Sequence, residues 1–73
     1  MKHTYDKEAD AMYIYLKKSR YFKTIEIRDD FLVDIDSNRN IIGIEILEAS
    51  KQVSKTFVKS AIRIDSLPSP VFK

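Results

Sequence analysis

The chain has 73 residues, a formal net charge of +2 and no cysteine. A chain of this length forms one small domain, and without cysteine it has neither disulfide bonds nor thiolate metal sites, so a cytoplasmic location is the default expectation. No apolar run approaches the roughly 20 residues of a membrane-spanning helix, and we therefore expect a soluble protein without a membrane partner.

Two short strands are predicted near the N-terminus. The first covers residues 2–5 and leads through an acidic turn into the second, at residues 11–17. Side chains alternate between the two faces of a strand, and here both faces are largely apolar: Met12, Ile14 and Leu16 on one, and Ala11, Tyr13 and Tyr15 on the other. This composition is typical of a central strand that is covered on each side.

Three further strands are predicted between residues 24 and 47. Residues 24–28 form the third strand, and its register against the second stays open, because Ile14 can face either Ile25 or Ile27. Residues 31–46 then predict a hairpin with a four-residue loop, in which Asn38 or Asn40 takes the left-handed conformation. The register is nearly forced, since a one-residue slip would mix core and solvent faces; it pairs Phe31 with Ile46, Val33 with Ile44, and Ile35 with Ile42.

The periodicity changes to about 3.6 residues after Ser50, a candidate N-cap. Val53, Phe57 and Ala61 recur every four residues and predict an amphipathic helix over about residues 51–63. The expected fold class is therefore α+β, an antiparallel β-meander of about five strands with one C-terminal helix packed on the sheet. One domain spans residues 1–73, with the sheet in 1–49, the helix in 50–64 and a tail in 65–73 that is either disordered or docked.

Three blocks of sequence carry a family resemblance. They are TYDKEADAMYIYL at 4–16, the acidic turn at Asp29 and Asp30, and VDIDSNRNIIGIEILEASK at 33–51. Together they resemble the domain of unknown function 2283 family of small bacterial and archaeal proteins, although glycine is usual there near Asp30 and Asn40. The resemblance covers about fifty residues and implies a β-meander with a C-terminal helix and no established activity. Some members resemble the smaller partner of toxin and antitoxin gene pairs, which implies an antitoxin-like, protein-binding role.

An acidic group is predicted on one face of the hairpin. Asp34, Asp36 and Glu45 share that face, and Asp34 lies opposite Gly43, which leaves a notch beside a carboxylate. Grouped carboxylates suit a hard cation such as Mg²⁺, so a metal-dependent hydrolase is a remote alternative. The competing interpretation is that the aspartates solubilise the strand and cap the turn, while Gly43 lets a side chain or a helix approach closely.

A basic stripe is predicted on the helix. Lys51, Lys55, Lys59 and Arg63 recur every four residues, opposite the apolar face. Such a stripe can follow phosphates, which makes a nucleic-acid-associated regulator the alternative function. The competing interpretation is a solvated helix face, because the net charge is low and no known nucleic-acid-binding motif accompanies the stripe.

Catalysis has the least support in the sequence. His3 is the single histidine, and one glycine in the whole chain excludes glycine-rich phosphate loops and nucleophile elbows. We therefore predict no catalytic residue, no metal site and no cofactor.

The leading prediction is a non-catalytic protein-interaction module. One helix cannot cover both apolar faces of the sheet, and uncovered apolar area is typical of an interface. We predict a homo-oligomer or a small protein partner, with Tyr13 and Tyr15 as anchors if the helix covers the aliphatic face. The competing interpretation is that the C-terminal tail folds over the remaining face.

Overall fold

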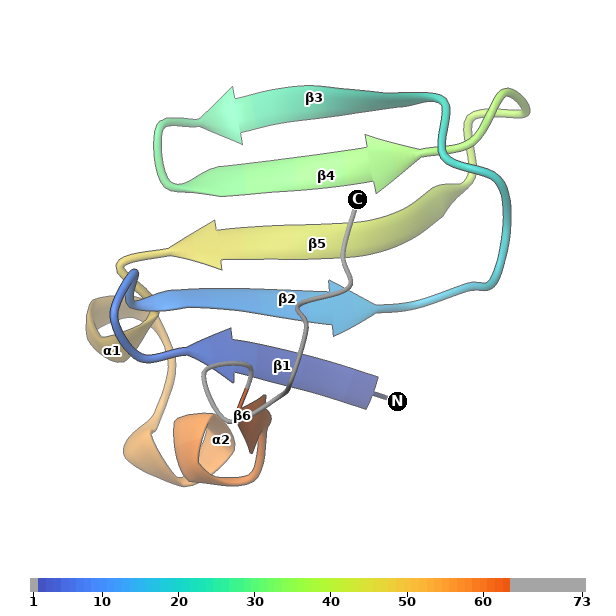
Figure 1. The fold of residues 1–73 in the computed structure, drawn as a ribbon. Coiled ribbons are helices and arrows are strands. Elements are labelled where there is room, and N and C mark those ends of the chain that lie inside the picture. Colours follow the sequence, from blue (N-terminus) through green and yellow to red (C-terminus); the bar gives the residue numbers. More distant parts are fainter. Residues whose placement is uncertain (1, 64–73) are drawn as a thin grey trace.

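The computed structural model describes residues 2–63, which form one mixed sheet with two short helices (Figure 1). Five strands are antiparallel to their neighbours, and a two-residue strand pairs in parallel with the first. Their order across the sheet is β3-β4-β5-β2-β1-β6. The strands are β1 (Lys2–Asp6), β2 (Ala11–Tyr15), β3 (Lys23–Arg28), β4 (Phe31–Ile35), β5 (Ile41–Leu47) and β6 (Ile62–Arg63).

The predicted α+β class is confirmed, but the chain does not form a simple meander. β2 pairs with β5 instead of β3, and the connection over residues 16–22 runs past the ends of β5 and β4 before β3 begins (Figure 1). The pairing sets Met12 against Ile46 and Ile14 against Ile44, so the aliphatic faces of both strands coincide. The predicted central position of β2 is confirmed, because it lies between β1 and β5.

The hairpin of β4 and β5 has the predicted register over most of its length. Phe31 pairs with Ile46, Val33 with Ile44 and Asp34 with Gly43. The last predicted pair is wrong, because a β-bulge shifts the register and sets Ile35 against Ile41. An extra residue of this kind lets a strand bend where it enters a loop.

The loop of this hairpin is organised by Asp36. Its carboxylate accepts the backbone N–H groups of Asn38 at 3.0 Å and Asn40 at 2.9 Å, and the hydroxyl of Ser19 at 2.9 Å. The left-handed residue is Arg39, with φ 67°, and not an asparagine as predicted. Because Asp36 fixes the N–H groups on both sides of it, the conformation of Arg39 is imposed by its neighbours.

The predicted single helix is two short helices, α1 (Ala49–Gln52) and α2 (Lys55–Lys59). Val53 separates them in an extended conformation, with φ −125° and ψ 163°. Ser54 then begins α2 as its N-cap, with its hydroxyl accepting the N–H of Phe57 at 3.1 Å. A second cap inside the predicted helix thus restarts the chain in a new direction. The predicted tail at 65–73 lies outside the described residues.

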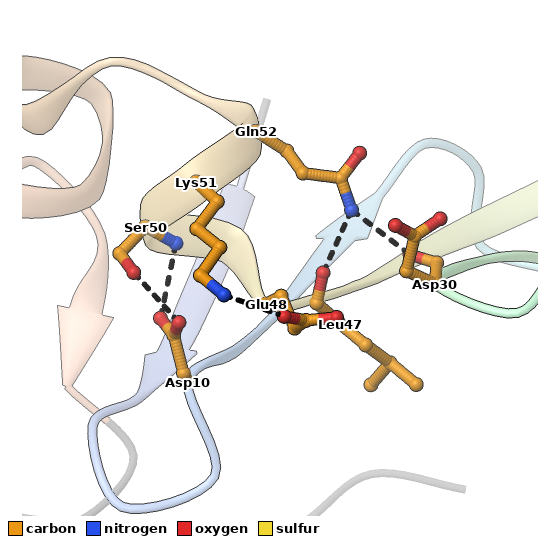
Figure 2. Close-up of polar contacts among 7 residues, drawn as sticks. All are labelled: Asp10, Asp30, Leu47, Glu48, Ser50, Lys51 and Gln52. Carbon is orange, nitrogen blue, oxygen red and sulfur yellow. Dashed lines mark hydrogen bonds and ion pairs between the residues drawn. The ribbon is translucent and has the colours of Figure 1, made fainter.

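Ser50 holds α1 against the turn between β1 and β2 and does not act as the predicted N-cap. Its backbone N–H and hydroxyl donate to the Asp10 carboxylate at 3.0 and 2.7 Å (Figure 2). The Tyr5 hydroxyl donates to the same carboxylate at 2.7 Å, and these bonds lower the pKa of Asp10. At the other end of α1, the Gln52 amide donates to the Leu47 carbonyl at 2.8 Å (Figure 2).

The helices cover the aliphatic face of the sheet around β1, β2 and the end of β5. The core beneath them consists of Tyr5, Met12, Ile46, Ala49 and Ala61. Partly buried side chains of both helices and of the sheet pack around this core. His3 belongs to this packing, because its ring stacks on Phe57 with 4.2 Å between the ring centres.

The Asp36 loop predicts a defined response to acid. The Asn40 N–H, followed by the side chains of Asn40 and Ser19, lowers the pKa of Asp36 from 3.8 to about 2. A carboxyl with a lowered pKa in the folded state stabilises the fold above its unfolded pKa, and this contribution is lost as the pH falls. The free energy of unfolding should therefore decrease between about pH 4 and pH 2.

Replacing Asp36 with asparagine should flatten that decrease. Urea unfolding of the native and Asp36→Asn proteins over this pH range measures it, and Asp29→Asn, at an exposed position, is the matched control. Equal acid dependence in all three proteins would contradict the assignment.

Candidate interaction surface

Tyr13 is buried by lying across the neighbouring strand. Its side chain passes over Gly43 in β5, and its hydroxyl donates to the Asp34 carboxylate in β4 at 2.6 Å. Only glycine leaves room for this path, since a Cβ at Gly43 would overlap the phenol. The predicted notch opposite Asp34 therefore exists, and the ring of Tyr13 occupies it.

Further hydrogen bonds and a second tyrosine ring surround this contact on the polar face of the sheet. Thr24 donates its hydroxyl to the other oxygen of Asp34 at 2.6 Å, and Tyr21 lies 2.8 Å from the Thr24 hydroxyl. Burial, followed by the hydrogen bond to Asp34, raises the pKa of Tyr13 above its usual value. Tyr15 packs edge-on against Tyr13 with 4.6 Å between ring centres.

The predicted tyrosine anchors are thus not equivalent. Tyr13 is only 7% exposed within one chain, so it is not an accessible anchor, whereas Tyr15 is half-buried. Sequence alternation placed both side chains on one face, but it could not show that one of them lies flat across a glycine. Of these two tyrosines, only Tyr15 is accessible to a partner.

The predicted acidic group is divided between two structural roles. Asp34 is 2% exposed and accepts two hydroxyl groups, and Asp36 is buried and organises the hairpin loop. The prediction that these aspartates solubilise the strand is wrong, whereas the predicted turn cap at Asp36 is confirmed. Glu45 lies on β5 beside Tyr13 and also has its own interactions. Within residues 2–63, no three histidine, cysteine or acidic side chains are grouped to hold a metal ion.

The predicted basic positions do not share one helix. Lys51 is in α1, where it pairs with Glu48 at 3.1 Å, whereas Lys55 and Lys59 are in α2. Arg63 lies in β6. The extended residue Val53 changes the direction of the chain between the first two positions, so the continuous stripe that the spacing predicted is not formed.

Large apolar side chains are exposed elsewhere in the described part of the chain. We call them the exposed apolar set: Leu16 (44% exposed), Tyr21 (51%), Phe22 (58%), Ile27 (57%) and Ile41 (50%).

Most of the exposed apolar set surrounds one end of the sheet. The backbone N–H of Leu16 donates to Ile42, and that of Phe22 donates to Ile35, whose strand partner is Ile41. These contacts gather residues from the connection between β2 and β3 around the start of β5, as the course of the ribbon illustrates (Figure 1). Ile27 lies near the far end of β3.

Sequence reasoning missed this set because it treated residues 18–23 as a short turn between neighbouring strands. The available signal was the apolar pair Tyr21 and Phe22 within a run of basic residues, which a solvated turn does not need. Isolated apolar residues are ordinary on protein surfaces, but several of them around one feature are informative.

The geometry thus defines a small α+β domain with a largely antiparallel sheet and two short helices. The model of a protein family described as "Protein of unknown function (DUF2283)" matches residues 2–50, and the chain belongs to this family. The predicted resemblance is therefore confirmed.

Among curated proteins, the chain is similar to an uncharacterized protein of Methanocaldococcus jannaschii. The two are 43% identical over 51 residues, an alignment that covers 70% of this chain and 43% of the archaeal protein. The chain therefore matches less than half the length of this relative. No solved structure matches this chain. Within residues 2–63, no helix is long and apolar enough to cross a membrane.

The path of Tyr13 predicts a specific cost for a side chain at Gly43. Gly43→Ala should lower the free energy of unfolding by about 1–3 kcal/mol, the usual cost of overpacking, because the new Cβ overlaps the Tyr13 phenol. Urea unfolding measures the change. In a Tyr13→Ala background the same substitution should be neutral or stabilising, because alanine suits a strand better than glycine does. A Gly43→Ala protein with the same free energy of unfolding as the native protein would contradict the proposed contact.

Proposed function

We propose that this chain is a non-catalytic protein-interaction module that binds its partner through the exposed apolar set. The observation that carries the proposal is the exposure of five large apolar side chains in so small a domain, three of them at or beside β3. Burying apolar surface contributes about 25 cal/mol per Å², so these side chains supply the main driving force for association.

Positive charges near the exposed apolar set would orient a partner as it binds. Lys17, Lys18, Arg20 and Lys23 are all exposed and surround Tyr21 and Phe22 along the chain. An apolar centre with a charged rim is the usual construction of a specific protein interface. A binding partner with acidic groups at its edge fits this arrangement.

The side chains best suited to chemistry have structural partners, which supports a non-catalytic role. Asp34 accepts bonds from Tyr13 and Thr24. His3 lies 3.0 Å from the Ser60 hydroxyl and stacks on Phe57. A general base must be able to reach the proton of a substrate, and both groups are already held in place by other residues of the chain.

Photo-crosslinking tests the proposal. A photoreactive phenylalanine analogue at Phe22 should give a discrete protein adduct in cells that express the chain, because this side chain is 58% exposed. The same analogue at Lys7, which is exposed in the turn between β1 and β2, is the control and should give none. Adducts at both positions, or at neither, would reject the exposed apolar set as the binding surface.

A further inference from the structure

The two edges of the sheet differ in how far they are covered. At one edge, β6 pairs with β1 through Thr4 and Tyr5. At the other, β3 pairs with β4 alone, and no other described strand lies beyond it (Figure 1). An open edge strand presents unpaired backbone N–H and C=O groups, and these form a template for another strand.

The backbone of β3 points regularly toward that open side. The N–H of Leu47 in β5 donates to the Asp30 carbonyl, so the alternate residues Val33 and Ile35 of β4 face β3. Their partners Ile25 and Lys23 direct their N–H groups inward, and Thr24 and Glu26 direct theirs outward. The bulge of β3 lies between Glu26 and Arg28 and leaves the segment before it regular.

We infer that the partner is a second copy of this chain, joined by antiparallel pairing of β3 with β3 about a twofold axis at Ile25. This inference rests on the proposed function and names the partner for the part of the exposed apolar set that lies on and beside β3. In this register Ile25 faces its own copy, Thr24 faces Glu26, and Lys23 lies across from Ile27. No like charges meet, and the aliphatic stem of Lys23 covers an exposed isoleucine.

Other symmetric registers are less favourable. A twofold axis at Glu26 sets two carboxylates opposite each other, and an axis at Thr24 pairs only residues 23–25 of β3. Like charges directly opposite each other destabilise a strand pair. An axis at Ile27 falls on the bulge, where the ladder is interrupted. The sequence of β3 thus complements itself best about Ile25.

The first test measures mass in solution. Size-exclusion chromatography with light scattering should give about twice the single-chain mass of 8.5 kDa at high concentration. Ile27→Lys should give the mass of one chain, because it sets an ammonium group across from Lys23 twice per dimer. Ile27→Glu should retain the dimer, with a stronger dependence on salt.

A matched control distinguishes the β3 edge from general loss of apolar surface. Ile41 is 50% exposed, similar to Ile27 at 57%, but it belongs to β5. Ile41→Lys should therefore remain dimeric. Circular dichroism confirms that each variant is folded before its mass is interpreted.

The second test reads the register with introduced cysteines, which the native chain lacks. Ile25 and its copy would form a non-hydrogen-bonded antiparallel pair, with Cα atoms about 4.5 Å apart, within reach of a disulfide. Ile25→Cys should therefore form a disulfide-linked dimer on oxidation. A mixture of Lys23→Cys and Ile27→Cys chains should form the mixed dimer, and Ile41→Cys should form neither.

The outcomes separate the two proposals. Self-pairing is overturned if the native chain is monomeric and Ile25→Cys forms no crosslinked dimer. The proposed function still stands in that case if the Phe22 analogue captures a different protein. A dimer that survives Ile27→Lys, or that crosslinks equally from Ile41→Cys, assigns the contact to another surface. Absence of both self-association and capture at Phe22 overturns both proposals.

Discussion

The path of Tyr13 across Gly43 is the constraint on which the arrangement of this sheet depends. The side chain begins on β2, crosses β5 and bonds Asp34 on β4, so one residue ties together three strands. The glycine is needed there for space, not for an unusual backbone conformation, since no glycine of the described residues has a positive φ. The contact also removes from the surface the tyrosine and the carboxylate that looked most available for binding.

Sequence patterns identified the parts of the fold that local alternation determines. The register of the hairpin follows from matching isoleucines on one face, and Phe31, Val33 and Asp34 all have the predicted partners. The strand that pairs with β2 could not be predicted in this way. Both β3 and β5 have alternating aliphatic residues, and alternation alone does not distinguish them. The choice follows from which pairing lets Tyr13 reach Asp34, and this contact joins residues 21 positions apart.

The C-terminal region shows a similar limit. The spacing of Val53, Phe57 and Ala61 correctly identified side chains that pack against the core, but it could not show that Ser50 is engaged by Asp10. Ser50 bonds a distant carboxylate while Ser54 caps the second helix, so the two serines divide the segment into α1 and α2. This division displaces the basic residues from one line and removes the geometric basis of the predicted stripe.

The distribution of exposed apolar residues then follows from the topology. The helices cover the aliphatic face around β1, β2 and the end of β5, and β6 pairs with part of the outer edge of β1. The connection that carries the chain to β3 leaves Tyr21 and Phe22 exposed, and β3 has a neighbour on one side only. A small domain buries a limited fraction of its apolar surface, and placing the remainder beside an open strand edge combines hydrophobic burial with directional backbone hydrogen bonds. Pairing through that edge would therefore bury exposed apolar side chains and satisfy open backbone N–H and C=O groups in a single contact. Neither the buried Tyr13 nor the basic residues divided between α1, α2 and β6 can make such a contact.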